Sequence, residues 1–121
     1  MIAVACAGRI FLRRQPTDMR KSFDGLSGIV RGELGRDPLA GDLFVFVNRR
    51  RDFVKALYWD RDGLALWAKR LARGRFAPQP DGPSEIGREE LTLLLEGVRA
   101  RVLSRSPRWQ PKTGQSGRAQ E

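Results

Sequence analysis

The segment between residues 43 and 76 limits the possible folds of this chain more than any other part of it. It reads LFVFVNRRRDFVKALYWDRDGLALWAKRLARGRF, in which apolar runs alternate with short basic or polar turns. Such runs, joined by hairpin-sized turns, predict three neighbouring antiparallel strands over 43–47, 53–59 and 64–71. The last run could also form a helix, but the two short turns beside it favour a strand.

The middle run predicts two different faces for the sheet, because successive side chains of a strand point to opposite sides. One face would carry Phe53, Lys55, Leu57 and Trp59. The other would carry Val54, Ala56 and Tyr58.

The residues before this segment predict a strand and a helix. A short strand is expected over 9–12. From Met19 to Leu34 the apolar residues recur every three or four positions, which is one face of a helix. Thr17 is the expected N-cap of this helix and Gly35 its expected C-cap.

A second helix is expected over 85–98, with Ser84 as its N-cap. The order is then β-α-β-β-β-α, which predicts an α+β domain with an antiparallel meander covered on one face by the two helices. We expect this single domain to span 1–100 and a disordered basic tail to span 101–121, where apolar residues are few.

Composition points to an anionic partner. The 121 residues carry a net charge of +9, with 19 Arg and 4 Lys. Arginine binds phosphate through two parallel hydrogen bonds, so a domain this basic suits nucleic acid. A GC-rich genome explains the excess of Arg over Lys equally well, but it does not explain the net charge.

Composition also excludes several classes of site. The chain has no histidine, and Cys6 is its one cysteine, so a structural zinc site and an intramolecular disulfide are excluded. Residues 2–7 are too few for a signal peptide, and no apolar run approaches the ~20 residues of a membrane helix. We expect a cytoplasmic protein that binds no cofactor, membrane or small-molecule substrate.

The expected turn over 48–52 holds three successive arginines, which could clamp a phosphate backbone. Residues 48–75 hold nine basic and three acidic side chains, which favours this function over that of a solvated turn that only discourages edge pairing. A second basic patch is expected at the start of the first helix. The predicted nucleic-acid contacts are Arg49, Arg50, Arg51, Lys55, Lys69, Arg70, Arg73 and Arg75, with Arg20 and Lys21 in the second patch.

Aromatic side chains lie among these basic residues. Tyr58, Trp59, Trp67 and Phe76 could stack on bases, but core packing is the usual role of such residues on strands. Tyr58 and Trp59 point to opposite faces, so one of them is expected at the surface. Tyr58, Trp59 and Trp67 are our candidates for contact with a protein partner.

Residues 60–63, of sequence DRDG, could hold a divalent metal between Asp60 and Asp62. A hairpin turn uses the same residue types, with Gly63 free to take a positive φ, and we favour the turn. No third carboxylate is suitably spaced, and no catalytic triad, Walker or dinucleotide motif is present. We therefore expect no enzymatic activity.

Three strings together resemble one family: PTDMRKSFDGL (16–26), DPLAGDLFVFVNRRRD (37–52) and LYWDRDGLALWAKRLARGRF (57–76). They are similar to the small TnpB-type, or Orf2-like, accessory proteins of bacterial IS66-type insertion sequences, over roughly residues 9–98. These proteins are unrelated in role to the RNA-guided nuclease that shares the TnpB name. The resemblance implies a non-catalytic part in DNA transposition, with the element's transposase, a further accessory protein and the DNA of the element ends as partners.

The chain departs from the family pattern at three places. Ser22 and Arg51 stand where the family usually has glycine, and the tryptophan that often follows Phe76 is missing. A positive φ at Arg51 would cost on the order of 1 kcal/mol, so the turn there is expected to be reshaped.

Three functional hypotheses follow. The first is a DNA-binding accessory factor that uses the basic hairpin. The second is a module that docks on the transposase, anchored by Tyr58 or Trp59, without binding DNA. The third, which we rank last, is a metal-dependent nuclease that uses Asp60 and Asp62.

Overall fold

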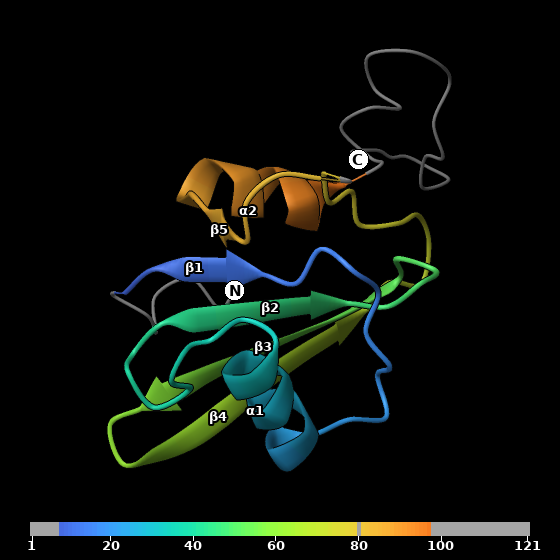
Figure 1. Ribbon diagram of the computed structural model, residues 1–121. Coiled ribbons are helices and arrows are strands. Elements are labelled where there is room, and N and C mark those ends of the chain that lie inside the picture. Colours follow the sequence, from blue (N-terminus) through green and yellow to red (C-terminus); the bar gives the residue numbers. More distant parts are fainter. Residues whose placement is uncertain (1–7, 80, 98–121) are drawn as a thin grey trace.

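A computed structural model of the chain describes residues 8–79 and 81–97. These residues form a five-stranded sheet of order β4-β3-β2-β1-β5 with two helices, which confirms the α+β class (Figure 1). The strands are β1 (Ile10–Leu12), β2 (Leu43–Val47), β3 (Phe53–Asp60), β4 (Gly63–Arg70) and β5 (Glu85–Ile86). The helices are α1 (Phe23–Gly32) and α2 (Arg88–Glu96).

The predicted meander is present in β2, β3 and β4. β2 pairs antiparallel with β3, and β3 pairs antiparallel with β4 in unbroken register from Phe53 opposite Arg70 to Asp60 opposite Gly63. The third run is therefore a strand and not a helix. The predicted division of β3 into two faces also holds, because Val54 and Ala56 lie in one core cluster and Leu57 in the other.

The sheet is mixed and not purely antiparallel. β1 pairs parallel with β2, because the crossover through α1 returns the chain in its original direction. β5 is an unexpected strand: the sequence pattern places Glu85 and Ile86 at the start of the second helix, but they pair with Phe11 and Ile10 of β1. The helix α2 begins only at Arg88, after the N-cap Gly87.

The two helices cover opposite faces of the sheet, whereas we expected them on the same face (Figure 1). Ile10, Leu12 and Val45 lie in the core cluster that includes Leu91 and Leu94 of α2. The alternate strand residues Phe11, Phe44 and Phe46 lie in the cluster that includes Leu26 and Val30 of α1. All five residues of β2 are buried, so this apolar strand needs a cover on both faces.

The helix α1 starts later than predicted. Thr17 is not its N-cap: the Thr17 N–H donates to the Val47 carbonyl over 2.9 Å, and its hydroxyl accepts from Arg13 Nη1 over 3.3 Å. The helix begins at Phe23, after the N-cap Ser22. Gly35 is not its C-cap: the C-cap is Glu33, and Gly35 takes φ 63° two residues further on.

Several predictions fall outside the described residues. These are Cys6, the end of the second helix at Val98, and the tail over 101–121. Neither helix in the described part of the chain is long and apolar enough to cross a membrane.

Candidate nucleic-acid interface

The turn between β2 and β3 is built around the side chain of Asn48. Its Oδ1 accepts hydrogen bonds from the N–H groups of Asp52 and Phe53, each over 3.0 Å, and its Nδ2 donates to Asp52 Oδ1 over 2.8 Å. With the turn held by these bonds, Arg49 and Arg50 are left exposed on its surface.

The chain after β4 returns to this turn. The Leu71 N–H donates to the Asp52 carbonyl over 2.7 Å, and the Phe76 N–H donates to the Arg51 carbonyl over 2.6 Å. Backbone bonds thus bring two segments about 20 residues apart in sequence to one end of the sheet. We call the cations gathered there the basic end: Arg49, Arg50, Arg51, Lys69, Arg70, Arg73 and Arg75.

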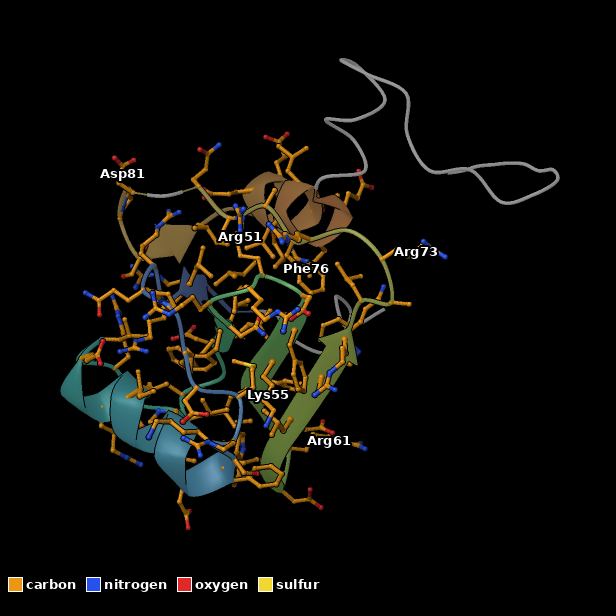
Figure 2. The ribbon with its side chains drawn as sticks, turned by 90° about the vertical axis from the view of Figure 1, so that its right-hand side faces the viewer. Arg51, Lys55, Arg61, Arg73, Phe76 and Asp81 are labelled. Atoms are coloured by element: carbon orange, nitrogen blue, oxygen red, sulfur yellow. The ribbon has the colours of Figure 1, made fainter. Side chains whose placement is uncertain are left out.

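Figure 2 shows how this end is laid out. Arg51 lies beside the buried Phe76, Arg73 projects outward from the segment after β4, and Arg61 lies at the opposite end of β4. The structure therefore brings together seven of the ten predicted contact residues.

The cations of the basic end lie on both faces of the sheet. Arg70 is on the α1 face, where its guanidinium stacks 4.6 Å from the centre of the Phe53 ring. Lys69 is on the α2 face and lines a groove of about 310 Å³ together with Arg73 and Arg75.

A second groove, of about 430 Å³, opens beside the turn. Arg49 and Arg51 line it, with Pro16 and Pro78 contributing apolar surface. Arg13 and Arg14 also line it, although sequence reasoning gave them no role. The sequence signal that could have found them is the pair of adjacent arginines directly after a strand.

Three arginines of the basic end, Arg49, Arg50 and Arg75, take no part in the ion pairs of the described residues. In the described residues the ion pairs join Arg9 to Glu85, Arg13 to Glu33, Arg14 to Glu90, Arg20 to Asp18 and Arg31 to Asp37. None of them involves Arg49, Arg50 or Arg75. Asp52 is the acid nearest the turn, and its pKa lies below its usual value, first because Asn48 donates to it and then because Arg50 and Arg70 are close.

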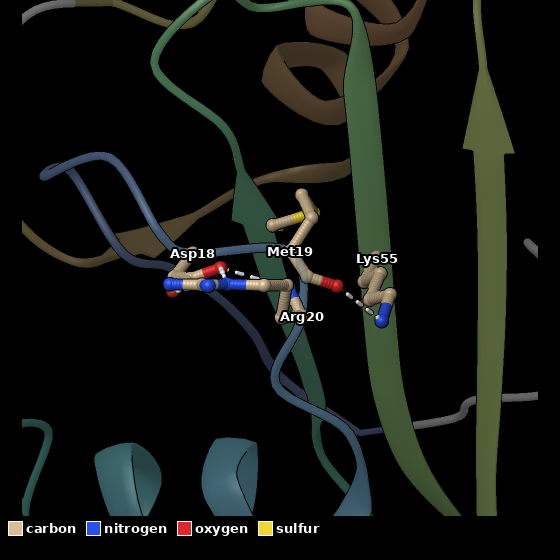
Figure 3. A network of polar contacts seen from close by, with 4 residues as sticks. All are labelled: Asp18, Met19, Arg20 and Lys55. Carbon is tan, nitrogen blue, oxygen red and sulfur yellow. Dashed lines mark hydrogen bonds and ion pairs between the residues drawn. The ribbon is translucent and has the colours of Figure 1, made fainter.

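Two predicted contact residues, Arg20 of the second patch and Lys55, are engaged within the chain (Figure 3). Arg20 forks onto Asp18, with its Nη2 2.7 Å from Oδ2, and this hydrogen bonding lowers the pKa of Asp18 to about 2. Lys55 Nζ donates to the carbonyl oxygens of Met19 and Lys21, each over 2.8 Å. Lys55 therefore fixes the loop before α1, while the Lys21 side chain is exposed.

The predicted aromatic contacts do not share one surface. Tyr58 and Trp67 pack against the core on the α2 face, whereas Trp59 is half-buried on the α1 face. Phe76 is fully buried and cannot stack on a base.

Asp60 and Asp62 belong to the β3–β4 hairpin turn. The Asp62 N–H donates to the Asp60 carbonyl, and Arg61, not Gly63 as predicted, takes the positive φ of 57°. Within the described ranges no group of three or more His, Cys, Asp or Glu side chains is placed to hold a metal ion.

Comparison with known protein families identifies the family of this chain. The family model described as "IS66 Orf2 like protein" matches residues 8–105, which include every described residue. The chain belongs to the IS66 Orf2-like family. This membership confirms the resemblance found in the sequence and implies an accessory role in an insertion sequence.

Two proteins similar to this chain come from Sinorhizobium fredii. "Uncharacterized protein y4jC" is 37% identical over 109 residues, covering 88% of this chain and 93% of that protein. "Uncharacterized protein y4hO" is 38% identical over 92 residues, covering 74% of this chain and 80% of that protein. No solved structure matches this chain.

One departure from the family pattern has a clear structural result. Arg51, where the resemblance leads us to expect glycine, adopts φ 62°. The positive φ is therefore not avoided by reshaping the turn, and the hydrogen bond from the Arg51 N–H to the Asn48 carbonyl, over 3.0 Å, helps to hold it.

Proposed function

We propose that this IS66 Orf2-like protein binds DNA phosphates through its basic end and so assists transposition of its insertion sequence. One observation carries the proposal. Backbone hydrogen bonds gather seven cations from two segments at one end of the sheet, and the ion pairs of the described residues involve neither Arg49, Arg50 nor Arg75.

The arrangement suits a phosphate backbone for physical reasons. Guanidinium groups bind phosphate oxygens with two hydrogen bonds each, and cations on both faces of a sheet end can follow successive phosphates. The proposed DNA contacts exclude Lys55, whose ammonium already serves two carbonyl oxygens. Arg20 contributes little net charge because Asp18 neutralises it.

The test is a fluorescence-anisotropy titration against the terminal inverted repeat of the element and a scrambled duplex, at several salt concentrations. Removing one arginine–phosphate pair should reduce the slope of log K against log salt by about 0.9. The variant Arg49→Gln/Arg50→Gln/Arg51→Gly should therefore lower the slope by roughly 3 units. Glycine is used at position 51 because it accepts the positive φ found there.

The matched control is Arg31→Gln/Arg61→Gly/Arg88→Gln. It removes the same number of charges and also places a glycine at a residue of positive φ, Arg61, but it leaves the basic end intact. Its salt slope should stay within about one unit of the parent protein. Equal slopes for the two triple variants would contradict the assignment of the basic end.

Docking on the transposase is the second candidate, and the half-exposed Trp59 favours it. A large aromatic side chain of this kind is a typical anchor of a protein interface. If docking is the function, the chain should co-purify with the transposase after nuclease treatment, and Trp59→Ala should abolish this. DNA binding in the titration would then be weak and the same for the inverted repeat and the scrambled duplex.

We propose no catalytic step for the chain. The family is one of accessory proteins, and Asp60 and Asp62 are accounted for by the hairpin turn. Unchanged transposition with an Asp60→Asn/Asp62→Asn variant would agree with this, and loss of transposition with retained folding would contradict it.

A further inference from the structure

The strand β4 is a long edge strand. It has eight residues and, in the described part of the chain, pairs only with β3. Its register with β3 is regular over all eight pairs, without a bulge. The edge at the other side of the sheet, β5, has only two residues.

The outer edge of β4 offers a row of unpaired backbone groups. In an antiparallel pair, alternate residues direct both their N–H and C=O groups to the partner strand. The bond from the Leu71 N–H to the Asp52 carbonyl shows that the odd-numbered residues of this strand face β3. Leu64, Leu66, Ala68 and Arg70 therefore direct their backbone groups away from the sheet.

Natural proteins protect such an edge with proline, bulges, inward charges or very short strands. β4 has none of these over its first six residues, GLALWA, which carry no charge. The side chains there are only partly buried, and Leu64 and Leu66 extend the apolar core of the α1 face towards the edge. The edge thus resembles a surface that is completed by another strand.

The charges flanking this apolar stretch suggest what that strand is. Asp60 and Asp62 lie at one end of β4, and Lys69 and Arg70 lie at the other. None of the ion pairs in the described residues involves Asp60 or Asp62. A neighbouring strand would complement this edge if its basic end lay beside the acidic end of β4. A second copy of β4 in antiparallel orientation meets this requirement.

We propose that β4 pairs antiparallel with β4 of a second copy of this chain, about a two-fold axis at Leu66. To form hydrogen bonds between the two copies, each strand must contribute residues whose backbone groups point away from its own sheet. In β4 these are the even-numbered residues. The register centred on Leu66 satisfies this and places Asp62 opposite Arg70 of the second copy, on the same face of the sheet. The result is one continuous sheet of two domains with Leu64, Leu66 and Ala68 adjoining across the axis.

This inference does not rest on DNA binding, although Arg70 belongs both to the basic end and to the proposed dimer contact. It rests on the edge and its charges, and the dimer would form whether or not the basic end contacts phosphate.

The first test is sedimentation equilibrium of the full chain. The protein is freed of nucleic acid and kept with a reductant so that Cys6 cannot cross-link. We expect a concentration-dependent species of twice the 13.7 kDa chain mass. A chain that remains monomeric at every concentration would overturn the proposal.

Ala68→Pro tests the edge itself. Proline removes the outward N–H at position 68 but no hydrogen bond to β3, so the fold should persist and the protein should become monomeric. Ala68→Thr is the matched control, because it retains the N–H and suits a strand, and it should still dimerise. A folded Ala68→Pro protein that remains dimeric would place the dimer contact elsewhere and overturn the proposal.

A charge exchange tests the register. Asp62→Arg and Arg70→Asp should each weaken the dimer about ten-fold, because each creates two like-charge contacts across the axis. The double variant Asp62→Arg/Arg70→Asp should restore the parent dissociation constant. Asp81→Arg, at an exposed site remote from β4, controls for net charge and should have no effect. Failure of the double variant to recover would rule out this register.

Discussion

The arginines of the first 20 residues and those of the basic end have opposite surroundings. Arg9, Arg13, Arg14 and Arg20 each form an ion pair with a carboxylate. The arginines of the β2–β3 turn form none with any described residue, although three of the five residues over 48–52 are arginines. The chain has a net charge of +9, but that total does not say which side chains are paired. The ion pairs within the fold determine which cations remain unpaired. The arginines of the first region are paired within the fold, whereas Arg49 and Arg50 are exposed and take no part in the described ion pairs.

For Arg13 and Arg14, but not for the exposed Arg9 and Arg20, the difference extends to burial. The side chain of Arg14 is 14% exposed and that of Arg13 is 15% exposed, whereas Arg49 and Arg50 are on the surface. A partly buried guanidinium group needs a hydrogen-bond acceptor for each of its N–H donors. A buried donor without an acceptor destabilises the fold by the free energy of its desolvation. The two regions should therefore respond differently to the same substitution.

The largest effect is expected for Arg14→Ala. Arg14 donates to the carbonyl oxygens of Pro83 and Gln79 and to Glu90, so its removal leaves three acceptors without a donor. We expect the free energy of unfolding, measured by urea denaturation, to fall by about 2–3 kcal/mol. The salt slope of DNA binding should be unchanged. Arg49→Ala should alter stability by less than about 0.5 kcal/mol, and an equal loss in both variants would remove the distinction between the regions.

Lys55→Met tests whether Lys55 stabilises the fold or contacts DNA. If Lys55 acts only through the carbonyl oxygens of Met19 and Lys21, the variant should lose about 1–2 kcal/mol of unfolding free energy. Its affinity for DNA should match that of the parent protein once the folded fraction is taken into account. A reduced salt slope in a stable Lys55→Met protein would return this residue to the DNA-contact set.

A smaller effect, of opposite sign, is expected from Arg51→Gly and Arg61→Gly. Both arginines hold a positive φ, of 62° and 57°, which costs a residue with a side chain about 1–2 kcal/mol. Glycine relieves this but loses about 0.5–1 kcal/mol through its flexible unfolded state, so each variant should gain about 0.5–1 kcal/mol. Only Arg51→Gly should weaken DNA binding, since Arg61 lies at the opposite end of β4 (Figure 2). Equal losses of affinity would indicate a general charge effect.

The smallest effect concerns pH. The pKa of Asp18 lies at about 2 in the folded chain because Arg20 donates to it. A pKa lowered by folding stabilises the folded state above the unfolded value near 4, and this contribution is lost as the pH falls from about 4 to about 2. Arg20→Gln should raise the pKa of Asp18 towards its ordinary value of 3.8, as measured by NMR titration. The lowered pKa of Glu33, which depends on Arg13, should not change and serves as the internal control.

Local patterns in the sequence predicted the elements that local patterns determine. The continuous apolar run of β2 and the alternation of β3 specified their positions and faces. The strand β5 could not be predicted in this way, because two residues carry no periodicity. It forms through contacts distant in sequence, with Ile86 opposite Ile10 and Glu85 bound to Arg9.

The candidate site was predictable in location but not in detail. The arginine clusters over 49–51 and 69–75 indicated the basic end, since a hairpin brings the two together. The ion pairs that remove Arg20 from the available charge, and the carbonyl oxygens that engage Lys55, depend on how loops fold back on the sheet. Sequence periodicity contains no information on such contacts, so the engagement of Arg20 and Lys55 within the chain could not be predicted.

The backbone bonds from Phe76 to Arg51 and from Leu71 to Asp52 have a consequence for how this family can evolve. They fix the two segments of the basic end without using any arginine side chain. Substitutions among those arginines can therefore change the charge of this surface while the backbone bonds that join its two segments remain. The scaffold and the side chains that it presents can in this way vary separately.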